Sequence, residues 1–167
     1  MSVLKRACIV LALLLLSATV LFAQDTTTTQ LSDIYAGGVS YNVSGSPSLA
    51  GTGLYAHRVA DSGTYAFTVV DAVPTSVKPV TVTTNFGVGV AQKVFTVGKI
   101  PIYIPTAAGA SYTGTNTGWA WSTGAMGVIK LKDSGYFLAP SVRLLKSSVS
   151  NGDGYQPIVT VMFGWGK

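Results

Sequence analysis

Residues 78–94 read KPVTVTTNFGVGVAQKV, and this stretch alternates between two kinds of side chain. Its even positions are mostly large and apolar, whereas its odd positions are small or polar. Successive side chains of a β-strand point to opposite faces of a sheet, so a period of two residues predicts a strand with two different faces. The apolar face comprises Val80, Val82, Thr84, Phe86, Val88 and Val90, and the opposite face comprises Thr81, Thr83, Asn85, Gly87, Gly89 and Ala91.

The same alternation recurs along much of the chain. Residues 63–73 and residues 155–166 also place their large apolar side chains on one parity. No window after residue 24 holds a sustained 3.6-residue apolar period, and clusters of Gly, Ser, Asp and Pro separate the alternating stretches. We therefore predict an all-β fold, a single antiparallel up-and-down β-barrel of about eight strands over residues 33–167. The predicted strands are residues 33–44, 48–60, 63–73, 78–94, 99–112, 118–131, 136–147 and 155–166.

The beginning of the chain has the layout of a secretory signal peptide. Lys5 and Arg6 precede an apolar run over residues 7–22, and Ala23 offers a small residue at the cleavage point. The alternative is an uncleaved anchor, but a run of about 16 apolar residues is short for a span that needs ~20. We predict a signal peptide at residues 1–23, followed by a flexible lead-in at residues 24–32.

The composition excludes several classes of site. The chain has 11 Lys and Arg and 6 Asp and Glu, and two of those cations lie in the leader, which leaves nine cations against six acids. Its one cysteine, Cys8, also lies in the leader, which excludes a cysteine zinc site, a disulfide framework and a redox thiol pair in the mature chain. So few cations argue against a nucleic-acid partner. We expect no cofactor and no metal.

The two faces of the strands decide between two kinds of barrel. In a soluble barrel the apolar face would line a ligand cavity, whereas in an outer-membrane barrel it would meet lipid. The other face is mostly Gly, Ala, Ser and Thr, which suits the narrow interior of eight strands better than a water-exposed surface. We therefore expect the apolar parity to face lipid, including Tyr65, Phe67 and Val69 of residues 63–73.

The aromatic residues and the cations favour the same choice. Aromatic side chains gather near strand ends, as in the belts of membrane barrels, although a sandwich core would also use aromatic residues. We predict an inner belt of Tyr35, Tyr65, Tyr136 and Trp165 and an outer belt of Trp119, Trp121 and Tyr155. Near these belts we expect cations that reach lipid headgroups: Arg58, Lys93, Lys99, Lys130, Lys132 and Lys167 at the inner rim, and Lys78, Arg143 and Lys146 toward the outer rim.

The opposite parity predicts the residues that face the lumen: Asn42, Asn85, Ser122, Ser141 and Arg143. In this interpretation no Asp shares the middle of the interior with Arg143, and an unpaired buried cation is costly. Arg143 must then lie at the rim or in a narrow passage that water reaches. We expect it at the rim, because it lies far along its strand.

Together with the leader and the eight strands, the last strand, Val159-Thr160-Val161-Met162-Phe163-Gly164-Trp165, makes a pattern that resembles the small eight-stranded outer-membrane β-barrel superfamily of Gram-negative bacteria, the OmpA/OmpX-like group. The resemblance covers residues 33 to 167. It implies export to the cell outer membrane, contact with membrane lipids, and handling by a periplasmic chaperone and the barrel-assembly machinery.

The candidate chemistry is sparse. His57, the one histidine, has Asp61 and Ser62 nearby in sequence, but a catalytic set needs hydrogen-bond geometry and not adjacency. Asn151 and Asp153 could bind Ca²⁺, yet a turn explains them better. We expect no catalysis, a monomer, a narrow or closed lumen, and a structural or surface-interaction role. The alternative is a secreted soluble β-barrel or sandwich that binds a small apolar ligand.

Overall fold

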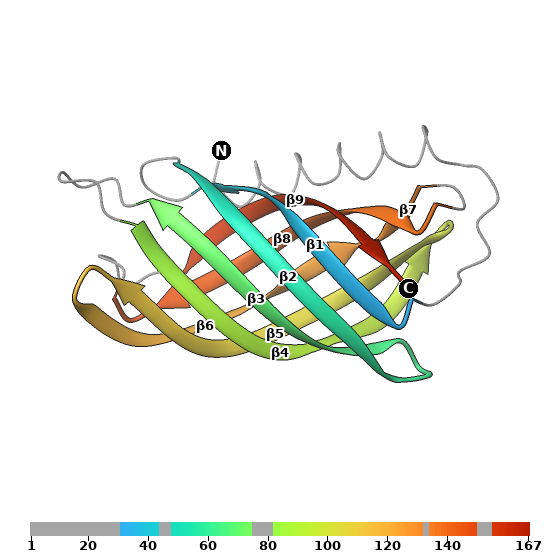
Figure 1. Ribbon diagram of the computed structural model, residues 1–167, viewed down its shortest axis with the longest axis horizontal. Helices are drawn as coiled ribbons and strands as arrows, with labels where there is room; N and C mark the ends of the chain where they lie inside the picture. Colours follow the sequence, from blue (N-terminus) through green and yellow to red (C-terminus); the bar gives the residue numbers. More distant parts are fainter. Residues whose placement is uncertain (1–30, 44–47, 75–81, 132–133, 150–154) are drawn as a thin grey trace.

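The computed structural model describes residues 31–43, 48–74, 82–131, 134–149 and 155–167 (Figure 1). The predicted signal peptide, most of the lead-in, and Lys78, Lys132, Asn151 and Asp153 lie outside these residues. The described part is all β. Its strands are β1 (Asp33–Asn42), β2 (Ser48–Ala60), β3 (Thr64–Pro74), β4 (Val82–Val97), β5 (Ile100–Thr113), β6 (Asn116–Gly127), β7 (Ile129–Lys130), β8 (Tyr136–Ser147) and β9 (Gln156–Gly166).

The strands close into an antiparallel barrel, which confirms the predicted fold. The barrel has eight positions (staves) around its axis, because β6 and β7 follow one another along the same position. Strands that follow each other in sequence are paired, except β6 and β7; β1 pairs with β9, and β6 pairs with both β5 and β8. β7 continues the stave of β6, because Met126 pairs with Ser141 and Ile129 pairs with Leu138 in one unbroken register. A closed sheet leaves no unpaired edge, which is a requirement for any β-structure in lipid.

The stagger of the strands follows from the pairing register. A path of paired residues that leaves β8 at Tyr136 returns to β8 at Lys146, a shift of 146 − 136 = 10 residues. The path passes through Trp165, Tyr35, Tyr55, Thr68, Val88, Ala108 and Trp121. With a rise of ~3.3 Å per residue and ~4.8 Å between strands, this stagger tilts the strands by about 40° from the barrel axis. The oblique strands are plain in Figure 1.

The barrel has two ends, which we name after residues on them. The Asp33 rim is the end where β1 begins and β9 ends, and the Trp119 rim is the opposite end, where Trp119 lies near the start of β6. The lumen has two layers. An apolar layer toward the Asp33 rim includes Tyr65, Phe67, Tyr103, Met126, Phe137 and Met162, and a polar layer beyond it includes Ser40, Thr52, Asp71, Asn85, Ser111, Ser141, Arg143 and Thr160.

The orientation of β3 corrects the sequence prediction. Tyr65, Phe67 and Val69 are buried in the lumen, so this strand turns its large side chains inward and its Ala66 and Val70 outward. The reason lies on β4, where the register sets Phe67 opposite Gly89 and Val69 opposite Gly87. A side-chain carbon of Val69 lies 3.3 Å from the position of a Cβ added at Gly87, so this glycine leaves room for a large side chain of β3 in the close-packed interior.

Glycine also shapes the wall itself. A Cβ added at Gly89 would lie against the backbone carbonyl oxygen of Thr106 and the Cα of Ala107 on β5. The two strands therefore approach more closely at this point than any larger residue would allow. Gly53, on the outer face of β2, has open space at the same position.

Candidate functional site

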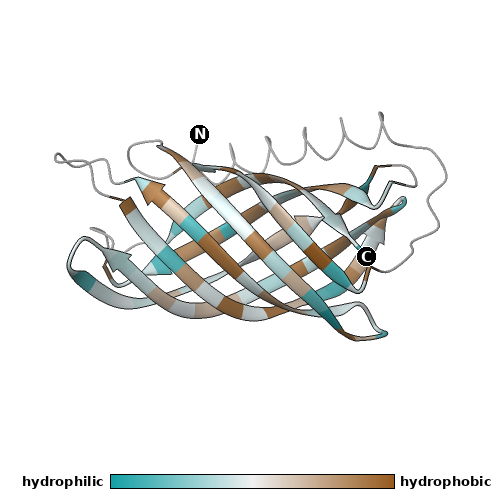
Figure 2. Ribbon diagram, viewed as in Figure 1, coloured by the Kyte–Doolittle hydropathy of each residue, from teal (hydrophilic) through white to brown (hydrophobic). Residues whose placement is uncertain are grey.

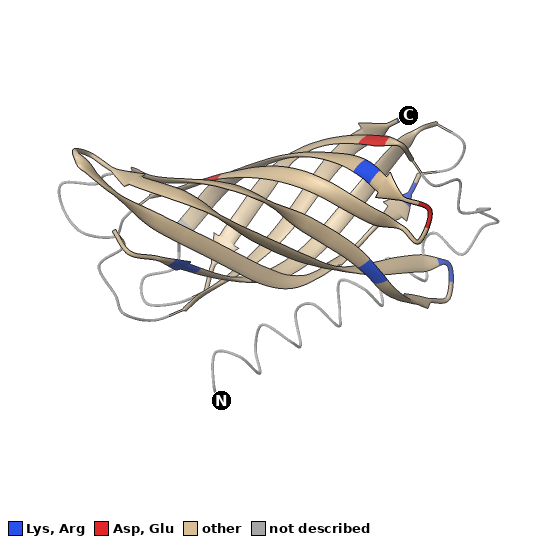
Figure 3. Cartoon of the chain, turned by 90° about the horizontal axis from the view of Figure 1, so that it is seen from below, with Lys and Arg blue, Asp and Glu red and all other residues tan. Residues whose placement is uncertain are grey.

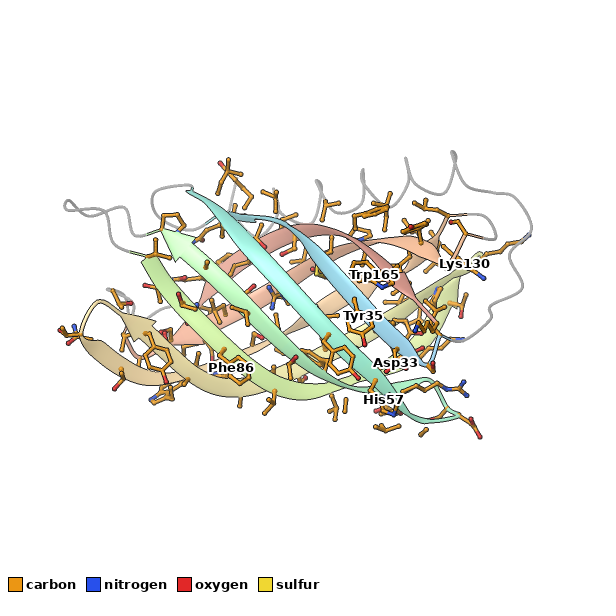
Figure 4. The ribbon with its side chains drawn as sticks, viewed as in Figure 1. Asp33, Tyr35, His57, Phe86, Lys130 and Trp165 are labelled. Atoms are coloured by element: carbon orange, nitrogen blue, oxygen red, sulfur yellow. The ribbon has the colours of Figure 1, made fainter. Side chains whose placement is uncertain are left out.

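The outer wall of the barrel is the most unusual surface of the described chain. Large apolar side chains are exposed along nearly every strand, and on β4 alone they include Val82, Phe86, Val88, Val90, Val94, Phe95 and Val97. Val88, in the middle of β4, is 53% exposed. Apolar and polar positions alternate along the ribbons in Figure 2, and Phe86 points away from the wall in Figure 4. Monomeric soluble proteins rarely expose contiguous apolar surface of this extent.

An aromatic row crosses four strands near the Asp33 rim. The register sets Tyr55, Tyr35, Trp165 and Tyr136 side by side on β2, β1, β9 and β8. The rings of Tyr35 and Trp165 are stacked at 5.5 Å, and Tyr35 lies 5.0 Å from Tyr55 (Figure 4). Tyr35, Tyr136 and Trp165 thus lie on the outer wall as predicted.

A second aromatic cluster lies near the Trp119 rim. Trp121 packs edge-on against Tyr155 with ring centres 5.5 Å apart. The Nζ of Lys146 lies 6.0 Å from the Trp119 ring centre and 5.4 Å from that of Tyr155. The predicted outer set of Trp119, Trp121 and Tyr155 is therefore one contiguous group.

The two groups are separated by the thickness of a bilayer core. Tyr155 and Trp165 lie ten residues apart at the two ends of β9. On a strand tilted by about 40°, ten residues advance about 25 Å along the barrel axis. Outer-membrane barrels carry an apolar band of about this height between aromatic girdles.

Tyr65 does not belong to the belt that the sequence predicted. Its side chain is 3% exposed, and its hydroxyl donates a hydrogen bond to the backbone oxygen of Leu31 at 2.8 Å. Its ring meets that of Tyr103 edge-on at 5.7 Å inside the lumen. Tyr55, on the outer parity of β2, occupies the corresponding place in the row.

All five residues predicted to face the lumen are buried there: Asn42, Asn85, Ser122, Ser141 and Arg143. Asn85 accepts a hydrogen bond from Ser111, whose hydroxyl also lies 2.6 Å from that of Ser147. A second chain of hydroxyls links Thr160, Ser40 and Thr52, and Thr52 donates to Asp71 at 2.7 Å. Among the described residues, the hydroxyl of Ser141 and the Nε of Arg143 have no hydrogen-bond partner.

Arg143 lies deep in the lumen and not at the rim, which is a second correction. Its guanidinium donates two hydrogen bonds to Asp71, from Nη1 to Oδ2 at 3.1 Å and from Nη2 to Oδ1 at 2.5 Å. The pair is nearly dry, with 5% of Arg143 and 2% of Asp71 exposed. Asp71 has the same parity as Tyr65, so the reversed orientation of β3 brings a carboxylate into the lumen.

Two small cavities lie in the lumen among the described residues. A cavity of about 20 Å³ lies in the apolar layer, lined by Phe67, Tyr103, Phe137 and Met162 among others. A cavity of about 10 Å³ lies beside Asp71 and Asn85. Spaces of this size suit about one water each and are far smaller than the ~300 Å³ of a ligand pocket.

His57 lies on the outer wall at the Asp33 rim and pairs with a different acid from the one near it in sequence. Its Nδ1 lies 2.9 Å from Oδ1 of Asp33 (Figure 4), whereas Asp61 pairs with Arg58 at 2.6 Å. Ser62 contacts Thr64, and Ser32 donates its hydroxyl to Asp33 and not to the imidazole. Asp33 lies beyond the aromatic row, outside the apolar band, and the His57 hydrogen bond lowers its pKa below the ordinary value.

The part of the chain that the structure describes has neither a cluster of metal ligands nor a helix that could span a membrane. There, His, Cys, Asp and Glu side chains nowhere gather in groups of three that could hold a metal ion. The same residues contain no helix of the length and apolarity that crossing a membrane requires.

Comparison with known proteins yields a structural likeness only. No protein-family model matches the chain, and no curated protein matches it. A solved structure described as "De novo design of transmembrane beta-barrels" aligns with a TM-score of 0.49 and 12% identity, over 83% of this chain and 99% of that chain. A likeness at this level does not bear on function.

Proposed function

We propose that the chain is a transmembrane β-barrel of the outer membrane, with a closed lumen and a structural or surface-interaction role. The observation that carries the proposal is the inverted distribution of polarity. The outer wall exposes apolar side chains between two aromatic groups, while the ion pair of Asp71 and Arg143 is buried inside.

The energetics favour lipid over water as the surroundings of this wall. Full burial of a Val or Phe side chain gains about 1.5–3 kcal/mol, so each of these roughly half-exposed side chains gains about half of that when it leaves water, and the wall carries many of them. Hydrogen bonds between all neighbouring strands satisfy the backbone within the barrel, as a bilayer core demands. A soluble protein of the same fold would place charged side chains where this chain has Val82, Val88 and Val90.

The resemblance to small Gram-negative outer-membrane barrels supports the location and the assembly route. A protein of that kind leaves the cytoplasm through a cleaved signal peptide and reaches the membrane with a periplasmic chaperone and the barrel-assembly machinery. We propose that this chain follows the same route and works as a monomer in contact with lipid. In this proposal it performs no catalysis, because Ser32 is bonded to the carboxylate of Asp33 and not to His57.

A gel of the outer-membrane fraction, run with and without boiling, tests the proposal. Closed membrane barrels resist the denaturing detergent until they are heated, so we expect the unboiled band to migrate differently from the boiled one. A soluble periplasmic or secreted band that does not shift would overturn the membrane function. It would favour the alternative of a soluble barrel, and extraction of a bound apolar ligand would then test that alternative.

A further inference from the structure

Leu31, which leads into β1, lies on the opposite side of the barrel wall from the one that alternation gives it. Even-numbered residues of β1, such as Ile34 and Ser40, are buried in the lumen, and odd-numbered residues, such as Tyr35, are exposed on the outer wall. Continued alternation would place Leu31 outside. Its side chain instead packs against the apolar layer of the lumen, which includes Phe137. The backbone therefore changes direction just before the regular part of β1.

A β-bulge at Ser32 and Asp33 produces this change. The backbone amides of both residues donate to one acceptor, the backbone oxygen of Lys167 after the end of β9, at 2.5 Å and 3.4 Å. Two successive residues thus stand opposite a single residue of the neighbouring strand, which is the arrangement of a bulge. A bulge bends the chain and redirects the side chains next to it. Here it turns Leu31 inward, over the mouth of the lumen at the Asp33 rim.

Two further features hold Leu31 in this place. The hydroxyl of Tyr65, on β3, donates a hydrogen bond to the backbone oxygen of Leu31 at 2.8 Å. On β9, Gly166 leaves the space that the leucine side chain occupies, because a Cβ added there would lie 2.5 Å from Cδ1 of Leu31. Residues at three strands, β1, β3 and β9, therefore form one seat for this side chain.

The layer inside Leu31 is apolar, whereas the rim around it is charged. Most of the charged residues in Figure 3 lie at the end that carries the carboxyl terminus. Asp33 pairs with His57 at this rim, and Arg58 pairs with Asp61. Directly inside lies the apolar layer with its cavity of about 20 Å³. Contact of water with this layer is unfavourable, so a side chain over the mouth separates two surroundings that do not mix.

We propose that Leu31 is a stopper, a hydrophobic lid that seals the lumen at the Asp33 rim and keeps water out of the apolar layer. The bulge, the hydrogen bond from Tyr65 and the space at Gly166 hold this stopper shut. The proposal rests on the closed membrane barrel proposed above and assigns the closure of one end to a single side chain. Leu31 is only partly buried and precedes the first strand, where local opening is easiest, so the stopper can open while the barrel stays folded.

Access of a thiol reagent to the apolar layer tests this proposal. The sequence has one cysteine, Cys8, so the full chain carries a single thiol when Ala56→Cys is made in a Cys8→Ser background. Ala56 is 4% exposed and lines the cavity of the apolar layer. The chain is refolded in phosphatidylcholine nanodiscs, which leave both rims open to solvent. The rate of modification by 2-aminoethyl methanethiosulfonate is then measured, and the chain unfolded in urea gives the rate for an open thiol.

We expect the thiol to react slowly while Leu31 is present and about tenfold faster in the Leu31→Ala variant, since that substitution removes most of a partly buried side chain. Tyr65→Phe removes only the hydrogen bond that holds the backbone of Leu31, so its rate should lie between these two. Leu49→Ala is the matched control. Leu49 is 67% exposed on the outer wall, so its truncation should leave the rate unchanged.

Equal rates for Leu31→Ala and Leu49→Ala would overturn the proposal, and so would a thiol that reacts as fast in the folded barrel as in urea. If Leu31→Ala does not fold, Tyr65→Phe and Leu49→Ala make the same comparison. The gel with and without boiling, run on the same samples, reports the membrane function separately. A missing heat-dependent shift would overturn that function, whereas a shifted barrel with one rate in all variants would overturn the stopper alone.

Discussion

Arg143 on β8 and Asp71 on β3 form a buried ion pair in the lumen, with two hydrogen bonds between the guanidinium and the carboxylate. The two residues are 72 positions apart in sequence, and only the closed barrel brings them together. Thr52 donates a further hydrogen bond to Asp71. The pair fixes which faces of β3 and β8 point inward, since a one-residue slip would move either charge to the apolar wall.

Removing one partner of this pair should be far more harmful than removing both. Asp71→Asn leaves the charge of Arg143 buried without a counter-ion, and we expect a loss of about 3–5 kcal/mol in the free energy of unfolding. Urea unfolding in lipid vesicles, followed by tryptophan fluorescence, measures this loss.

The double variant Asp71→Leu/Arg143→Met is the control for the same site. It removes both charges and fills the space with apolar groups, so we expect it to be more stable than Asp71→Asn. A double variant less stable than the single one would show that the pair does more than neutralise charge.

The wrong orientation predicted for β3 explains why the predictions for Tyr65, Asp71 and Arg143 all differ from the structure. The barrel, its eight staves and the five lumen residues were predictable because alternation of period two is strong in most strands. On β3, however, the residues of both parities are compatible with lipid, and its alternation predicts that the larger side chains lie on the outer wall. That prediction placed Tyr65 in a belt, removed Asp71 from the lumen, and so left Arg143 without a partner.

The correct orientation of β3 depends on its neighbour and not on its own sequence. A side-chain carbon of Val69 lies next to the position that a Cβ would take at Gly87, so this glycine makes room in the lumen for an inward side chain of β3. A one-strand pattern cannot show this complementarity, because it exists only after the strands are paired. A volume count across paired strands could have found it, since an eight-stranded interior must be filled by side chains.

Two buried serines should respond differently to the same substitution. Ser111 and Ser141 are both fully buried, but Ser111 bonds to Asn85 and Ser147, whereas Ser141 has no partner among the described residues. We expect Ser111→Ala to cost about 1–3 kcal/mol and Ser141→Ala to be neutral or slightly stabilising. The same urea titration compares them, and equal losses would indicate that Ser141 has a partner such as a buried water.

Two glycines of the wall offer a second matched pair. Gly89→Ala would press a methyl group against the backbone of Thr106, and we expect a loss of about 1–3 kcal/mol. Gly53→Ala meets open space, so its stability should stay the same or rise by about 0.4–1 kcal/mol as the unfolded chain loses freedom. The temperature at the midpoint of the heat-dependent gel shift shows which of the two variants is the more stable. A Gly89→Ala barrel as stable as Gly53→Ala would show that β4 and β5 can separate at this point.

A charge placed on the outer wall distinguishes lipid from water as its surroundings. Val88 lies in the middle of β4 with its side chain exposed, and Gln92 lies on the same face four residues, or about 10 Å, closer to the Asp33 rim. In a membrane, Val88→Arg should cost about 2–4 kcal/mol and Gln92→Arg about 0–1 kcal/mol, because the penalty falls toward the interface. In water, an exposed Val88→Arg should change the stability by no more than about 0.5 kcal/mol. Urea unfolding in vesicles measures both variants, and equal, small effects at the two positions would contradict the orientation of this wall toward lipid.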